Sequence, residues 1–106
     1  MNLSSDADLA RLGAVPLYYE ASLVDVKPGD ILIRRQRLDV LVMYRVYLLL
    51  SDIPEGDRHS DTLVTYNVNA LELTGSYIPR RFLFAAHQLG KSNTVRIYHV
   101  PRGGDM

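Results

Sequence analysis

Apolar and polar residues alternate along much of the chain, and this two-residue period predicts β-strands. The alternation is clear over Leu17–Val24 and Thr62–Leu71, and a Pro28-Gly29 turn leads into a further strand at Ile31–Arg35. Alternation directs apolar side chains to one face of a strand and polar ones to the other. We therefore expect half-buried strands in a domain that is mainly β.

The segment Asp39–Leu50 differs because both of its faces are apolar. A helix is the alternative here, but the content of Val and Tyr favours a strand. Its length indicates a strongly bent strand that serves two sheets of a small barrel. The next segment, Ser51–Asp61, contains Pro54, Gly56 and five charged residues, and we expect an exposed loop.

The two ends of the chain add shorter elements. Ser4 to Gly13 carries serine at an N-cap position, an acidic first turn and a glycine stop, which predicts a short helix. Strands are predicted at Ile78–Phe84 and Thr94–Val100, with a helical turn at Ala85–Leu89 between them.

Together these elements predict one small antiparallel SH3-like barrel of five to six strands with a short N-terminal helix. We divide the chain into a short helical arm at 1–14, a single β-barrel domain at 15–101 and a flexible tail at 102–106.

The amino-acid composition excludes several classes of site and partner. The 106 residues include no Cys, which excludes a thiol nucleophile, a disulfide framework and a cysteine zinc site. Lys+Arg and Asp+Glu are equal at 12 each, so the bulk charge does not favour nucleic acid or a membrane surface. The amino end has no signal-peptide pattern, and we expect a cytoplasmic protein without a membrane partner or a cofactor.

Arginine and tyrosine are the candidate contact residues, since Arg pairs with carboxylate or phosphate and Tyr suits surfaces that are partly buried and partly exposed to solvent. The predicted binding residues are Arg34, Arg35, Arg45, Tyr77, Arg80, Arg81, Arg96 and Tyr98. A single face shared by these arginines would favour a nucleic-acid or acidic partner, and scatter would favour neither. Neighbouring arginines on a strand point to opposite faces, which favours a distribution of the arginines over more than one face.

Arg45 is the charged residue on an otherwise apolar strand face, so its guanidinium requires a partner. Glu72 and Asp39 are the candidate partners. Alternatively, Arg45 lies at the barrel mouth, where its aliphatic part is buried and its guanidinium group is exposed to solvent.

Other polar groups give weaker signals. Asp57, His59 and Asp61 alternate along the loop and would project to one side as metal ligands. No second cluster with ligand spacing supports a metal site, so we favour a solvated, acid-rich loop and assign no metal site. His87 and His99 have no nucleophile at a recognisable spacing, so we assign no catalytic residue.

The segment from Lys27 to Phe82 resembles a family of small uncharacterised bacterial and phage domains. It shares a Pro-Gly-Asp turn at 28–30, a His-Ser-acid-Thr loop at 59–62, a Val-rich strand ending at Tyr66 and a Pro-Arg segment before Phe82. The loop is longer here, and the order of Pro79 and Arg80 is reversed. The resemblance implies an SH3-like fold and no particular chemistry.

Gly29-Asp30-Ile31 also resembles the strand opening of plasmid-toxin ribonucleases of the growth-inhibitor type, although the proline of their Arg-Pro signature is absent after Arg37. That resemblance implies an RNA-cleaving enzyme that uses Arg37 or Arg45 with Asp30 or His87.

Two classes of function follow. The first is a small non-enzymatic binding module, a phage or mobile-element accessory protein that contacts another protein through its Tyr and Arg residues. The alternative is a nucleic-acid-binding or ribonuclease-like barrel. A homodimer is a further alternative, because the two-sided apolar strand over 40–50 suits burial by a second copy.

Overall fold

The structure is a computed structural model that describes residues 3–75, 77–90 and 94–101. The predicted tail at 102–106 lies outside the described residues. The helices are α1 (Asp6–Arg11) and the short 3-10 helices η1 (Glu20–Asp25) and η2 (Ala86–Gln88). The strands are β1 (Val15–Pro16), β2 (Ile31–Leu38), β3 (Leu41–Leu49), β4 (Asp57–Arg58), β5 (Val64–Glu72), β6 (Pro79–Ala85) and β7 (Val95–Val100).

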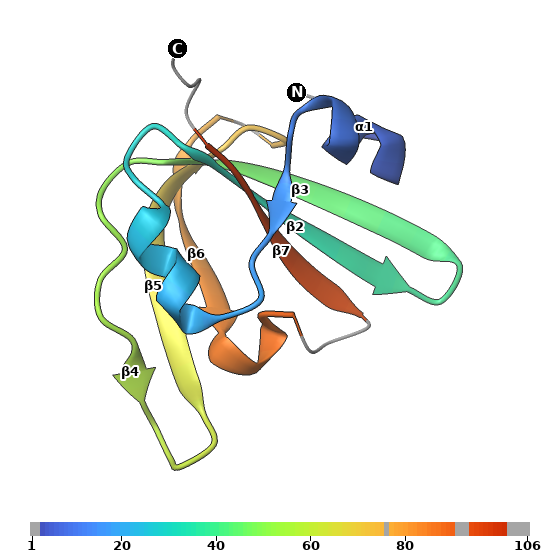
Figure 1. Ribbon diagram of the computed structural model, residues 1–106. Coiled ribbons are helices and arrows are strands. Elements are labelled where there is room, and N and C mark those ends of the chain that lie inside the picture. Colours follow the sequence, from blue (N-terminus) through green and yellow to red (C-terminus); the bar gives the residue numbers. More distant parts are fainter. Residues whose placement is uncertain (1–2, 76, 91–93, 102–106) are drawn as a thin grey trace.

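The strands form one antiparallel sheet that curls into a half-barrel (Figure 1). The order along the sheet is β1-β7-β2-β3-β5, and β4 and β6 both pair with β5. The predicted class, a small mainly β antiparallel domain with a short N-terminal helix, is confirmed. Five strands are long, and β1 and β4 have two residues each.

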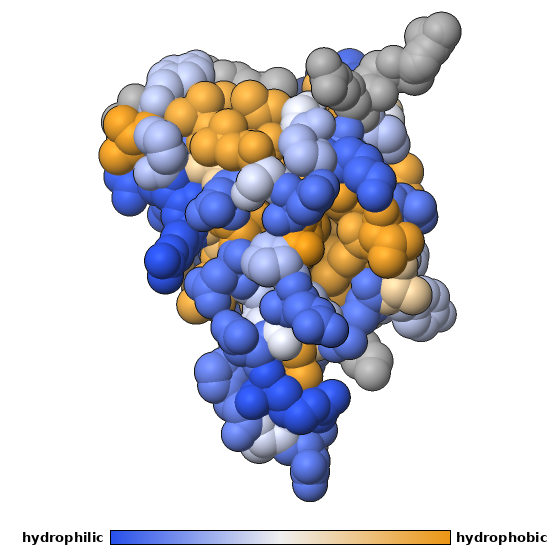
Figure 2. Space-filling model, turned by 90° about the vertical axis from the view of Figure 1, so that its left-hand side faces the viewer, coloured by the Kyte–Doolittle hydropathy of each residue, from blue (hydrophilic) through white to orange (hydrophobic). Residues whose placement is uncertain are grey.

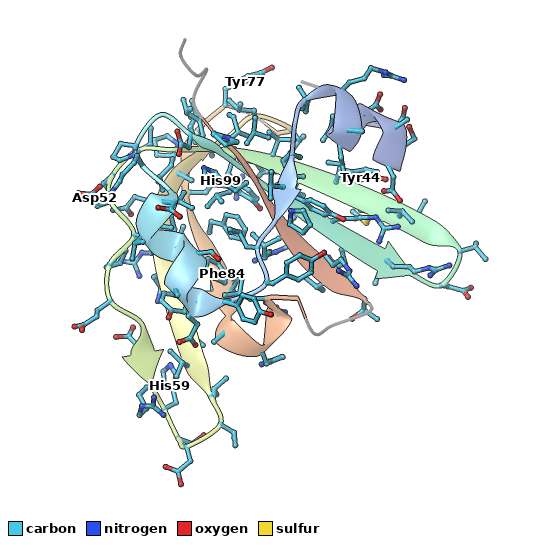
Figure 3. All side chains as sticks on the ribbon, in the orientation of Figure 1. Tyr44, Asp52, His59, Tyr77, Phe84 and His99 are labelled. Carbon is cyan, nitrogen blue, oxygen red and sulfur yellow. The ribbon has the colours of Figure 1, made fainter. Side chains whose placement is uncertain are left out.

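The main core fills the concave side of the half-barrel. Phe82 and Phe84 on β6 are each 1% exposed, and the Phe82 ring stacks on the Tyr47 ring with centroids 4.3 Å apart. Leu32 on β2 and Ile97 on β7 bury their side chains in the same core. Figure 3 shows Phe84 in the interior that the curled sheet encloses.

A second core lies on the convex side, where α1 covers the sheet. Leu9 of α1 packs against Ile33 and Val46 of the central strands. A polar contact adds to this, because the Asp6 carboxylate accepts hydrogen bonds from the Tyr44 hydroxyl at 2.6 Å and from the Arg35 guanidinium. The helix predicted at the amino end is therefore packed on the sheet.

The two-sided apolar segment is explained by these two cores. β3 is a central strand that pairs with β2 and β5, which confirms the strand and excludes the helix. Val46 faces the second core, and Tyr47 and Leu49 face the main core. Both faces of this part of β3 are thus covered within one chain.

The prediction of a strand over Leu17–Val24 was wrong. Only the first residue behaves like a strand, with the Leu17 amide donating to the Ile97 carbonyl, and the chain then turns into η1. The buried residues of this region are Leu17, Leu23 and Val26, so a three-residue spacing replaces the period of two after Glu20. The alternation in the sequence did not correspond to burial.

The predicted exposed loop is confirmed, with β4 as a two-residue strand inside it. Figure 2 shows hydrophilic surface over the lower end of the molecule, where β4 and the β4–β5 turn lie. In the part of the chain that the structure describes, no helix has the length and apolar character needed to cross a membrane.

Candidate functional site

The eight predicted binding residues do not share one face. In the β2–β3 pairing Arg34 lies opposite Arg45, and in the β2–β7 pairing Arg35 lies opposite Arg96. Because side chains alternate along a strand, these two pairs lie on opposite sides of the sheet. The eight residues divide into a concave set of Arg34, Arg45 and Arg80, a set of Arg35, Arg96, Tyr98 and Arg81 on the other side, and Tyr77 in the β5–β6 turn.

Two residues of the set on the other, convex side contribute to the packing of α1 on the sheet. The Arg35 Nε lies 2.8 Å from Asp6 Oδ1, and this contact raises the pKa of Arg35. Tyr98 packs against the second core. These two side chains therefore have partners within the fold.

The three concave arginines and Glu72 form a cluster on the concave face of the half-barrel, which we call the arginine mouth. Arg45 Nη1 lies 3.6 Å from Glu72 Oε2, and Arg80 Nε lies 3.4 Å from Glu72 Oε1. The predicted partnership of Arg45 with Glu72 is confirmed. Glu72 is buried, whereas the Arg45 and Arg80 side chains are 48% and 52% exposed.

Arg34 crosses the concave side and contacts β6. Its guanidinium carbon lies 4.5 Å from the centre of the Phe82 ring, and its Nη2 donates to the Leu83 carbonyl. Its Nε is buried and has no hydrogen-bond partner among the described residues. A buried donor without a partner costs about 1–3 kcal/mol, so this nitrogen requires an explanation.

The electrostatics of the mouth are unbalanced. Burial lowers the pKa of Arg34, and the charge of Arg45 lowers it further. Like charges placed directly opposite each other in a sheet are destabilising. Among the described residues Glu72 is the carboxylate that pairs with this cluster, and it contacts Arg45 and Arg80. The three arginines and Glu72 of the mouth therefore have a formal net charge of about +2.

A buried polar pair that the sequence reasoning missed lies at the start of β2. His99 Nε2 is 2.8 Å from Asp30 Oδ2, and the two residues are 8% and 4% exposed. Figure 3 shows His99 inside the fold, close to the segment that leads into β2. The sequence signal was an Asp after a Pro-Gly turn and a lone His in an apolar strand, 69 residues apart, and no periodicity links them.

The ribonuclease interpretation pairs Arg37 or Arg45 with Asp30 or His87, and the structure bears on the pairing of Arg37 with Asp30. The two residues lie near opposite ends of β2, seven positions apart, which corresponds to about 23 Å of extended strand. The odd difference in position also directs their side chains to opposite faces. The geometry does not bring these two groups to one reacting centre.

The loop with Asp57, His59 and Asp61 is stabilised by contacts within the protein. His59 Nε2 lies 2.8 Å from the Thr65 hydroxyl oxygen, and Asp57 pairs with Thr65 in the β4–β5 ladder. Within residues 3–75, 77–90 and 94–101, no group of three metal-ligating side chains gathers at one place.

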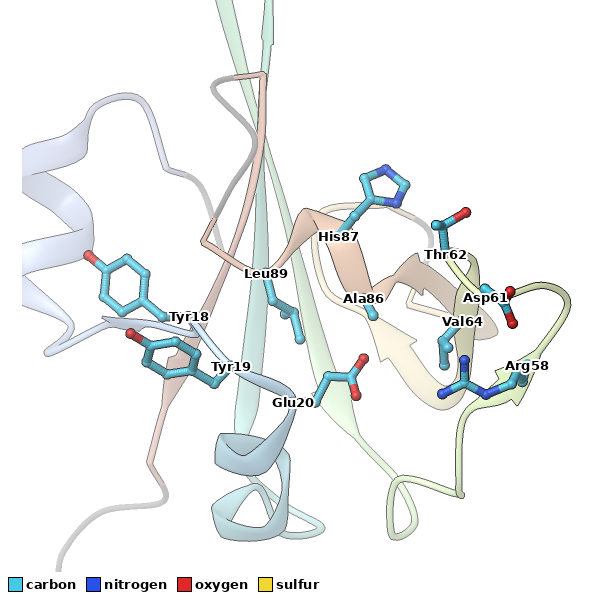
Figure 4. Close-up of a pocket in the computed structure, with 10 residues that line it drawn as sticks. All are labelled: Tyr18, Tyr19, Glu20, Arg58, Asp61, Thr62, Val64, Ala86, His87 and Leu89. Atoms are coloured by element: carbon cyan, nitrogen blue, oxygen red, sulfur yellow. The ribbon is translucent and has the colours of Figure 1, made fainter.

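A pocket of about 300 Å³ lies between η1, the β4–β5 hairpin and η2 (Figure 4). Val64, Ala86 and Leu89 provide apolar lining. The polar lining residues are Tyr18, Tyr19, Glu20, Arg58, Asp61, Thr62 and His87. No pattern in the sequence indicated this pocket, because its residues come from three separate segments.

Comparisons with protein-family models, with curated proteins and with solved structures found no match to the chain.

Proposed function

We propose that this protein is a small non-enzymatic binding module whose arginine mouth holds carboxylate groups of an acidic segment of a partner protein. One observation carries the proposal: Arg34 and Arg45 lie opposite each other on one face, and Arg34 has a buried Nε without a partner among the described residues. A bound carboxylate would compensate the like charges that face each other, because guanidinium groups donate paired, charge-assisted hydrogen bonds to it.

The distribution of charge favours a protein partner over nucleic acid. Binding of single-stranded nucleic acid combines a basic groove along the phosphates with aromatic platforms for the bases, and the predicted arginines divide over two sides of the sheet. The mouth is local and includes the acidic Glu72. A short acidic peptide segment suits such a site better than a strand of RNA or DNA.

The wider setting rests on the sequence. We propose that the protein works in the cytoplasm as an accessory protein of a phage or mobile element, supported by the cysteine-free composition and the resemblance over Lys27 to Phe82. Light scattering with and without the peptide distinguishes a monomer from a homodimer.

The binding proposal is tested by fluorescence anisotropy with a labelled peptide rich in Asp and Glu. The double variant Arg45→Gln/Arg80→Gln should bind it at least roughly tenfold more weakly, because two charged donors are lost. Arg81→Gln is the matched control, since Arg81 follows Arg80 on β6, lies opposite Asn69 and faces away from the mouth.

Two outcomes would overturn the proposal. In the first, the double variant binds as well as the unmodified protein, or an Asn- and Gln-rich peptide binds equally. In the second, labelled single-stranded RNA is bound in preference to the peptide. Cleavage of that RNA would establish the ribonuclease-like alternative.

A further inference from the structure

The pocket beside η1 carries an inference that does not depend on the arginine mouth. Its floor is apolar, and Leu89 in this floor is 1% exposed. Its volume of about 300 Å³ is at the lower end of the range for small-molecule sites, roughly 300–1,000 Å³. The size suits a ligand of amino-acid dimensions.

Charges of both signs surround this floor. Glu20 comes from η1, and Arg58 and Asp61 come from the β4–β5 hairpin. Figure 4 shows the Glu20 carboxylate and the Arg58 guanidinium extending toward the space between them from opposite sides. Among the described residues, none of these three groups forms an ion pair with another side chain.

The contacts these groups do make leave charge for a ligand. Arg58 Nη1 donates to the Ser60 carbonyl at 3.4 Å, which is a neutral acceptor at long range. The Glu20 carboxylate lies near the Tyr66 phenol, and burial together with this negative charge raises the pKa of Tyr66. The phenol is a neutral partner, so the charge of Glu20 is not neutralised.

We infer that this pocket binds a small zwitterion of the apolar amino-acid class. Its carboxylate pairs with Arg58, its ammonium group pairs with Glu20, and its side chain covers Val64, Ala86 and Leu89. A guanidinium matches a carboxylate through two parallel hydrogen bonds, and an ammonium group donates to a carboxylate. A ligand with a single charge satisfies only one side of the pocket.

The first experiment needs no substitution. Leucine, N-acetylleucine and leucinamide are titrated at millimolar concentration into the full chain, and two-dimensional NMR follows the amides that line the pocket. Leucine should shift these resonances in a saturable way, and each derivative should bind roughly tenfold more weakly, since each lacks one of the two charges.

Variants then assign the two ends of the ligand. Glu20→Gln should remove the preference for leucine over N-acetylleucine, and Arg58→Gln should remove the preference for leucine over leucinamide. Asp52→Asn is the control, because Asp52 is an exposed carboxylate on the neighbouring loop and lies outside the pocket lining.

The inference is overturned if neither leucine nor another apolar amino acid shifts the pocket resonances. It is also overturned if the three ligands bind equally, because the charged ends then contribute nothing. The ligand series on the unmodified protein keeps the test valid if a variant fails to fold. Failure here leaves the arginine mouth untouched, since that site is measured with the acidic peptide.

Discussion

At the tip of the β2–β3 hairpin, Asp39 has a backbone conformation that suits glycine. Its φ is 57°, in a two-residue turn between the paired Leu38 and Leu41. Gly adopts positive φ without the steric cost that an L side chain brings, although Asp tolerates it better than most. Asp39→Gly should therefore raise the free energy of unfolding by about 0.5 kcal/mol in urea denaturation.

The adjacent residue provides the control for this prediction. Val40 is 92% exposed and has no positive φ, so Val40→Gly only adds freedom to the unfolded chain. It should lower the free energy of unfolding by about 0.5 kcal/mol. A shift of the same sign in both variants would show that backbone strain at Asp39 is not the cause.

Substitution of Arg34 should change the affinity for the acidic peptide much more than the free energy of unfolding. Arg34→Met keeps an apolar contact with the Phe82 ring and removes the buried Nε and the like charge opposite Arg45. It also loses the bond to the Leu83 carbonyl. We expect the free energy of unfolding to change by less than about 1 kcal/mol, because gain and loss offset each other.

Binding should respond more strongly than stability in this variant. The affinity of Arg34→Met for the acidic peptide should fall roughly tenfold in the anisotropy assay. Peptide binding that survives alongside a large loss of stability would contradict the prediction and would make Arg34 a purely structural residue.

The candidate site was predictable from sequence as residue types, and its arrangement was not. Arg45 with Glu72 followed from the need of a charged group on an apolar face. The placement of Arg34 opposite Arg45 depends on the two-residue turn after Leu38. A change of register by one residue would have moved Arg34 to the other face, and the hydrophobic pattern alone does not fix that register.

At the scale of elements, α1 is held on the sheet by an apolar and an acidic contact. Leu9 supplies the first, and Asp6 supplies the second through Tyr44 and Arg35. The hydrogen bonds from these two residues lower the pKa of Asp6 from its ordinary value of 3.8, with Tyr44 as the larger cause. The carboxylate is mostly exposed, so its contribution is less than about 1 kcal/mol.

The lowered pKa sets the direction of the pH dependence. The stabilisation is complete above 3.8 and is lost as the pH falls through the lower value that Asp6 has in the folded protein. We expect weaker docking of α1 under acid, seen as loss of amide protection in α1 by hydrogen exchange. Asp6→Asn should remove this component, and a variant that retains it would place the acid sensitivity in another group.

Strands were predictable where burial and alternation coincide. In Val64–Glu72, Tyr66, Val68 and Ala70 are buried every second residue, as the pattern indicated. The same reasoning failed at η1, because the alternation there was accidental and a short helical segment turns the chain toward β2. Local pattern does not reveal where the chain must turn to close the open end of a half-barrel.

At the scale of the whole molecule, the Asp30–His99 pair joins distant parts of the chain. Asp30 Oδ2 accepts from the Lys27 amide at 2.9 Å and contacts His99 Nε2 at 2.8 Å. One carboxylate oxygen thus fixes the turn before β2 and also the last strand, β7. In an open half-barrel this side-chain contact adds to the β2–β7 ladder as a link between distant segments.

A double-mutant cycle measures that link. Asp30→Ala and His99→Ala should each lower the free energy of unfolding by about 3 kcal/mol, because each leaves a buried polar partner behind. The double variant should lose about 1–3 kcal/mol less than the sum, since both members of one pair are then absent. His59→Ala is the control: His59 is exposed and bonds to Thr65, so its loss should stay within about 0.5 kcal/mol. Additive losses at Asp30 and His99 would mean that the two residues stabilise separate regions and that the backbone ladder alone holds β7 in the half-barrel.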